Sequence, residues 1–221
     1  MEQSVKARHE ALGYEVELVV PLESRDRPAV AAFMSGQYYE PETHSAFAAI
    51  LRRRRGAAVH AGTFFGDMLD TLSRNATAVV AFEPVARNFE LATINSASLS
   101  NVTLYHAALS NRDGHVRMAT RTWTRKPLGG ASTVSPRGNE VTRCMKLDTL
   151  GLRDVSLIHL DVEGHELSAL EGAKGTIVRD RPTILIEDNA KNCDAFLATL
   201  GYSRAGNVET LGLYGAINSG G

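Results

Sequence analysis

The sequence predicts an α/β fold, with a doubly wound, mostly parallel sheet that carries helices on both faces. From residue 57 onward, short apolar runs alternate with amphipathic segments, as in "AAVHAG" followed by "DMLDTLSR". The apolar runs are nearly continuous, which is typical of parallel strands buried on both faces. With 221 residues, the chain is long enough for one sizeable domain and short for two.

The first part of the chain, residues 1–56, is expected to be an extension that packs on the core domain, residues 57–221. Its hydrophobic pattern predicts a strand, a short helix and a longer helix, at residues 14–20, 29–39 and 41–55. Thr43 is the expected N-cap of the longer helix and Gly56 its expected C-cap.

The sequence pattern of the core domain predicts alternating strands and helices. The predicted strands lie at residues 57–62, 78–84, 102–109, 157–164 and 183–188. The predicted helices lie at residues 67–74, 86–99, 165–179 and 191–201. Residues 111–145 are more polar and predict one or two extra strands around a long loop, which we expect to face the substrate as a lid. In this loop Trp123 either stacks on a ligand or anchors the loop in the core.

The composition and charge of the chain limit the classes of binding partner that we expect. The net charge of −1 gives no general attraction to nucleic acid or to an anionic membrane. Four arginines at residues 52–55 complement the dipole at a helix C-terminus, so they do not by themselves indicate nucleic-acid binding. No apolar run has the length of a membrane span, and the N-terminus lacks the order of a signal peptide. We expect a cytoplasmic protein with a small-molecule partner, and leave a homo-oligomer open.

The end of the first core strand, "HAGTFFGD", has the features of a ligand-binding corner. Gly62 and Gly66 permit close backbone approach, but the third glycine of a dinucleotide fingerprint is missing and Phe64 and Phe65 fill the space that phosphates need. About 20 residues further on, Glu83 ends the next strand, where a carboxylate can accept the hydroxyls of a ribose. A nucleoside without phosphates is therefore indicated, which fits S-adenosylmethionine.

The segments "VHAGTFFGDML", "VVAFEPVARNFE", "NVTLYHAALSNRDG" and "LIHLDVEGHELSALEGA" together resemble the FkbM-type methyltransferases over about residues 36–190. The resemblance implies a Rossmann-like class I methyltransferase fold with S-adenosylmethionine as cofactor. In this family the first motif more often begins with Asp, and here His60 and Thr63 depart from that pattern. Either His60 replaces the acidic residue by hydrogen bonding, or another carboxylate, such as Asp67 or Asp161, holds the ammonium group of the cofactor.

When the functional positions of the family are carried over to this sequence, they imply roles for residues at the four strand ends. The methionine portion of the cofactor would be lined by His60, Ala61, Gly62, Thr63 and Gly66. Glu83 would bind the ribose and Asn88 would support its loop. His106 and Ala107 would lie beside the adenine, and Asp161 beside the sulfonium and the substrate.

The fourth strand end, "LIHLDVEGHE", gathers the candidate catalytic groups. Methyl transfer is an in-line displacement, so the protein must mainly align the acceptor, and a nearby base adds rate when the acceptor is an alcohol. We assign orientation to Asp161 and acid–base work to Glu163 or His165. The alternative is that Glu163, His165 and Glu166 only stabilise a helix N-terminus. His159 and Asp161 share one strand, but no third ligand is fixed by spacing, so we expect no metal.

The predicted function is S-adenosylmethionine-dependent methyl transfer to a small molecule, with O-methylation of a sugar or secondary-metabolite hydroxyl as the specific expectation. Two other classes remain open. An NAD(P)-dependent oxidoreductase has a related sheet, although the first corner disfavours a diphosphate. A catalytically silent nucleoside-binding module would keep the same pocket without turnover.

Overall fold

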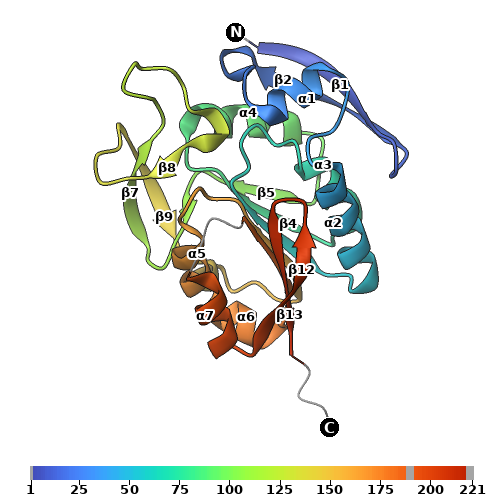
Figure 1. Ribbon diagram of the computed structural model, residues 1–221, viewed down its shortest axis with the longest axis vertical. Coiled ribbons are helices and arrows are strands. Elements are labelled where there is room, and N and C mark those ends of the chain that lie inside the picture. The colour runs from blue at the N-terminus through green and yellow to red at the C-terminus, as the bar shows by residue number, and fades with distance from the viewer. Residues whose placement is uncertain (1, 188–191, 218–221) are drawn as a thin grey trace.

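The computed structural model describes residues 2–187 and 192–217, and its centre is a seven-stranded sheet (Figure 1). The strands run in the order β12-β13-β11-β10-β3-β4-β5. Their bounds in this order are Tyr202–Val208, Leu211–Ala216, Thr183–Glu187, Val155–Leu160, Ala57–Ala61, Val79–Phe82 and Val102–Tyr105. The five strands from β11 to β5 are parallel, and β13 is antiparallel to both of its neighbours.

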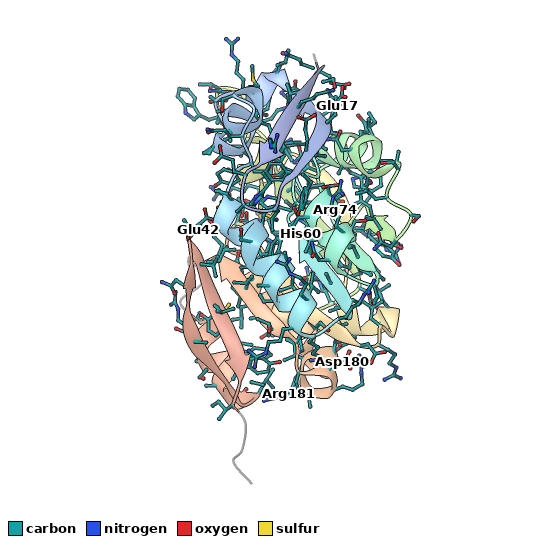
Figure 2. The ribbon with its side chains drawn as sticks, turned by 90° about the vertical axis from the view of Figure 1, so that its right-hand side faces the viewer. Glu17, Glu42, His60, Arg74, Asp180 and Arg181 are labelled. Atoms are coloured by element: carbon teal, nitrogen blue, oxygen red, sulfur yellow. The ribbon has the colours of Figure 1, made fainter. Side chains whose placement is uncertain are left out.

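Helices cover both faces of this sheet, because its strands are apolar on both sides. On one face lie α2 (Pro41–Arg53) and α3 (Leu69–Asn75), which pack on Ala58, Ala81 and Leu157. On the other face lie α5 (Glu166–Gly172), α6 (Lys174–Asp180) and α7 (Cys193–Thr199). Figure 2 shows α2 crossing in front of the sheet. The predicted doubly wound, mostly parallel fold is confirmed.

The N-terminal residues form a cap above the first strand end. They comprise a hairpin of β1 (Glu2–His9) and β2 (Tyr14–Pro21), the short helix η1 (Leu22–Ser24) and α1 (Pro28–Met34). Val30 and Phe33 pack on Phe65, and Asn95 of α4 (Ala86–Ser96) exchanges two hydrogen bonds with the backbone of Val19. The cap therefore closes over the corner that carries the two glycines.

A small second sheet stands beside the carboxyl ends of the central strands (Figure 1). It contains β6 (Ala108–Leu109), β9 (Glu140–Met145), β7 (Gly114–Ala119) and β8 (Thr133–Val134), and the short helices η2 (Gly129–Ala131) and η3 (Leu147–Leu150) flank it. The expected extra strands within residues 111–145 are present as β7 and β9. Trp123 is 96% exposed, so the expectation that it anchors the loop in the core is wrong.

Several element boundaries differ from the sequence-based expectation. The predicted strand 102–109 is divided into β5 and β6, and the predicted helix 165–179 is divided at Ala173. Thr43 is not an N-cap: α2 begins at Pro41, and the backbone N–H and Oγ1 of Thr43 donate to Glu209. Gly56 is not a C-cap either, because the helix ends at Arg53 and Arg54 is its C-cap.

No helix within residues 2–187 and 192–217 has the length and apolarity that crossing a membrane requires.

Candidate functional site

A cavity of about 280 Å³ lies at the carboxyl ends of β3, β4, β10 and β11. The strand order reverses between β3 and β10, and open parallel sheets bind ligands at such a reversal. Pro28 and Ala29 of α1 and the three residues of η2 also line the cavity. The residues from β3 and its loop that line it are His60, Ala61, Gly62, Phe64, Asp67 and Met68.

The first corner brings the backbones of β3 and β10 into direct contact. Gly62 has φ +91°, and a Cβ atom at this position would overlap the carbonyl oxygen of Asp161. The N–H of Asp161 donates to the carbonyl of Ala61 at 3.0 Å, and the N–H of Gly62 donates to the carbonyl of Phe82 at 3.1 Å. Glycine is required here because both the dihedral angle and the space exclude a side chain.

Thr63 and Gly66 hold this corner together and do not line the cavity. The hydroxyl of Thr63 is buried and donates to the carbonyl of Phe82 at 3.1 Å. Gly66 has φ +91° and packs against Ala92 of α4, where a Cβ atom would lie 3.3 Å from the Ala92 Cα. Both residues therefore shape the loop from behind.

Glu83, at the end of β4, is buried and faces the cavity. Its Oε2 accepts from the N–H of Phe64 at 2.8 Å, and its Oε1 accepts from the N–H of Val85 at 2.9 Å and from Asn88 Nδ2 at 3.3 Å. Burial raises the pKa of the Glu83 carboxyl to about 7, against the opposing effect of these donors. Because a carboxylate oxygen accepts two hydrogen bonds, Oε2 keeps one lone pair for a ligand.

Asn88 links this carboxylate to the loop of the second sheet. Its Nδ2 also lies 3.4 Å from the carbonyl of Gly129, in the η2 segment that lines the cavity. The side chain is buried and lines the cavity between the two.

His60 forms a buried pair with His159. The two Nδ1 atoms are 2.8 Å apart, so one ring donates and the other accepts, and burial lowers the pKa of His60 to about 4. Nε2 of each ring is buried and has no hydrogen-bond partner within the described part of the chain. Figure 2 places His60 in the interior of the molecule, beside α2. The pair is therefore neutral at pH 7.

Three carboxyl groups meet at the fourth corner. One oxygen each from Asp161, Glu163 and Glu187 lies within 4.8 Å of the others. Burial, followed by the charges of Glu187 and Glu163, raises the pKa of Asp161 well above its usual range, and Asp161 shares a hydrogen bond with Glu187. The three groups therefore form a cluster of carboxyl oxygens whose charge a proton or a cation would balance.

The other two candidates of this corner differ in what they face. His165 lines the cavity, its Nε2 lies 3.0 Å from the hydroxyl of Ser110, and burial lowers its pKa. Glu166 is buried outside the cavity lining, and its Oε1 accepts from the N–H groups of Val162 and Gly164. Glu166 therefore stabilises the turn between β10 and α5.

The sequence from residue 56 to residue 206 matches the model of the methyltransferase FkbM domain. The chain belongs to the FkbM methyltransferase family. Among solved structures it is similar to the methyltransferase FkbM of Methylobacillus flagellatus KT, with a TM-score of 0.53 at 16% identity. That match covers 73% of this chain and 44% of the other, so the chain spans less than half of that protein. The likeness shows the class I methyltransferase fold.

Two further matches have lower TM-scores. An rRNA methylase from Streptococcus thermophilus is 15% identical with a TM-score of 0.48, over 87% of this chain and 98% of that one. A methyltransferase from Geobacter sulfurreducens is 16% identical with a TM-score of 0.48, over 79% and 77%. No curated protein matches the sequence.

Within this FkbM domain, the third strand end lies differently from the arrangement that the resemblance implies. His106 is exposed and stacks on Phe89, with ring centroids 4.8 Å apart, and Ala107 is buried in the core. Neither lines the cavity, whereas the next two residues, Ala108 and Leu109, do. His106 and Ala107 lie in the break between β5, which ends at Tyr105, and β6, which begins at Ala108.

The cavity of the FkbM domain also uses residues that sequence reasoning did not assign. Glu187 ends a strand that was predicted, so its position carried the same signal as Glu83. Tyr39 and Glu40 precede α2, in the segment "MSGQYYEPETH" that the sequence suggests as a border of the acceptor pocket, with packing as the alternative for Tyr39. Further lining that was not expected comes from Arg27, Pro28 and Ala29 near the start of α1, and from Met118 of β7. Residues 129–132 and Val134 line the cavity from the loop that was expected to face the substrate.

Proposed function

We propose that the chain transfers a methyl group from S-adenosylmethionine to a hydroxyl of a small molecule, a sugar or a secondary metabolite. Glu83 carries this proposal: a buried carboxylate at the end of β4 keeps one free lone pair toward the cavity. A ribose hydroxyl is a donor that such a lone pair accepts. The neighbouring Phe64 narrows the corner where a dinucleotide would need room for its phosphates.

The donor set of the cavity fits this cofactor. Gly62 lines the cavity together with Glu83, and Ala108, Leu109 and Met118 offer an apolar wall for a base. When bound, S-adenosylmethionine supplies an electrophilic methyl group. The protein then has to hold the acceptor oxygen in line with that group and take up its proton.

For these tasks we propose Asp161 as the orienting group and Glu163 or His165 as the proton acceptor. All three line the cavity at the fourth corner. His165 is uncharged at pH 7 because burial lowers its pKa, so its ring is able to accept a proton. Replacing His165 by Ala is expected to lower kcat about 10²-fold or more while donor affinity stays within a factor of about two. Unchanged turnover would remove His165 from the reaction.

Calorimetry with S-adenosylhomocysteine and with NADH tests the proposed cofactor. We expect the folded protein to bind S-adenosylhomocysteine with a Kd in about the micromolar range and to bind NADH at least about 100-fold more weakly. A well-folded protein that takes up no S-adenosylhomocysteine would contradict the proposal. Preferential uptake of NADH would favour the oxidoreductase instead.

A chelator test addresses the three carboxyl groups of the fourth corner. We propose that a shared proton, and no metal ion, balances the charge of Asp161 and Glu187. Binding of S-adenosylhomocysteine and methyl transfer are therefore expected to be unchanged in EDTA. Activity that disappears in EDTA and returns with Mg²⁺ or Mn²⁺ would show that the cluster holds a divalent cation.

A further inference from the structure

Asp67 is a buried carboxyl group that has no role in the proposed reaction. It lies in the loop between β3 and α3, is 5% exposed and lines the cavity. No other described residue donates a hydrogen bond to its side chain or forms an ion pair with it. Asp70, three residues on, is almost equally buried at 6%, but it is paired with Arg74 at 2.7 Å and lies outside the cavity lining.

The surroundings of Asp67 make its charge costly in the absence of a ligand. Burial raises the pKa of this carboxyl to about 7, and the nearby Glu40 raises it further. Tyr39, Asp161 and His60 also line the cavity, and none of them brings a positive charge at pH 7. Arg27, a cation in the lining, acts on the pKa of Glu163 and is not among the groups that shift the pKa of Asp67. A buried carboxylate without a partner is retained at a cost in stability, and a cationic ligand would remove that cost.

The other polar groups of the first corner are less suited to a cation. The Nδ1 of His60 is used by His159, and its Nε2 is buried. Glu83 receives three donors, and Asp161 shares a hydrogen bond with Glu187. Of the two carboxyls that line the cavity from the ends of β3 and β4, Asp67 and Glu83, Asp67 is therefore the one whose oxygens accept no hydrogen bond from another described residue.

We propose that Asp67 binds the ammonium group of the donor's amino-acid tail. The inference rests on the proposed function, because the ammonium group that Asp67 would bind belongs to the proposed S-adenosylmethionine cofactor. Asp67 then fills the role that His60, a neutral ring held by His159, does not fill. Binding moves the proton of Asp67 to solvent and leaves an ammonium–carboxylate pair, so affinity for the tail rises with pH between about 6 and 8.

Two ligands separate this contact from the rest of the site. S-adenosylhomocysteine carries the amino-acid tail, and 5′-methylthioadenosine has the same nucleoside and thioether without it. For Asp67→Asn we expect an affinity for S-adenosylhomocysteine about 10- to 100-fold lower than wild type, with unchanged affinity for 5′-methylthioadenosine. The matched control Asp70→Asn, which removes an equally buried carboxyl outside the cavity, is expected to change neither affinity.

The pH dependence gives a second measurement. The ratio of the two affinities is expected to shift toward S-adenosylhomocysteine from pH 6 to pH 8 in wild type and to stay constant in Asp67→Asn. Titration of Glu83 changes the affinity for both ligands equally, because both carry the ribose. Its effect therefore cancels in the ratio of the two affinities. Circular dichroism confirms that each variant is folded.

The outcomes are distinguishable. An equal loss of both ligands in Asp67→Asn, or no loss of S-adenosylhomocysteine, would overturn the assignment of Asp67 and leave the proposed function standing. A folded wild-type protein that binds neither ligand would remove the proposed function itself.

Discussion

Replacing Gly62 by Ala is expected to prevent stable folding, with a loss of more than about 4 kcal/mol in the free energy of unfolding. Two costs coincide at this position. The residue has φ +91°, and the added Cβ would overlap the carbonyl oxygen of Asp161 on the adjacent strand. Relief would require β3 and β10 to move apart at the ends that form the site. Urea denaturation followed by circular dichroism measures the loss, and the yield of soluble protein reports it when the variant does not fold.

Gly164→Ala is the matched control for this substitution. Gly164 has nearly the same dihedral angle, φ +89°, but no atom lies within 4 Å of the position that its Cβ would occupy. The control therefore carries only the backbone cost of about 1–2 kcal/mol. Equal losses for the two variants would show that the contact between the strand ends does not determine the effect.

The central strands were predictable from sequence because they are buried on both faces. Every residue of β3, β4 and β10 is buried, so each strand stands out as an apolar run against its polar flanks. Strands with one exposed face lack this contrast. β1 and β12 carry mostly exposed residues, and neither was predicted.

Errors at element boundaries have local physical causes. Thr43 has the residue type of an N-cap, but Pro41 at the first turn starts α2 earlier, and the Thr43 N–H finds its acceptor in Glu209, distant in sequence. The helix division at Ala173 follows Gly172, a residue of low helix propensity whose Cβ position is filled by the carbonyl oxygen of Ser110. Such features depend on contacts between distant segments, which one sequence does not display.

In the cavity, too, the features set by the local sequence pattern were predictable, and the features set by contacts between distant segments were not. Gly62, Glu83 and Asp161 each follow an apolar strand, and parallel strands bring their carboxyl ends to one edge, so their common location followed from the pattern. The contribution of α1 did not follow, because its residues reach the cavity only through the packing of the cap. The contribution of η2 was expected, because η2 lies in the loop that the sequence placed over the substrate. His60 is a further example: burial keeps its ring neutral, and its contact with His159 arises because the register of β3 and β10 places the two residues side by side.

Replacing Glu83 by Gln is expected to lower the affinity for S-adenosylhomocysteine about 100-fold, or about 3 kcal/mol. The amide has one acceptor oxygen, whereas the carboxylate accepts from Phe64 on one side and from Val85 on the other. In either orientation the amide NH₂ faces a backbone N–H, so the corner opens and the ligand loses a charged acceptor. Calorimetry with S-adenosylhomocysteine measures the change.

Glu140→Gln serves as the control for this variant. Glu140 accepts from the N–H of Ala86 at 2.8 Å, at the first residue of α4, but it does not line the cavity. It therefore tests the loss of a carboxylate that supports the same helix without reaching the ligand. We expect wild-type affinity for S-adenosylhomocysteine in this control, and an equal loss in both variants would contradict a ribose-binding role of Glu83.

The pH dependence of unfolding provides an independent check on Glu83. Its folded pKa of about 7 lies above the ordinary value of 4.5, so between these values the folded state binds more protons than the unfolded state. The stabilising contribution of the protonated group is complete below pH 4.5 and is lost as the pH rises through 7. Without ligand, the wild-type free energy of unfolding should therefore fall more steeply from pH 5 to pH 8 than that of Glu83→Gln. Equal slopes for wild type and Glu83→Gln would show that the Glu83 carboxyl does not have the raised pKa of a buried group.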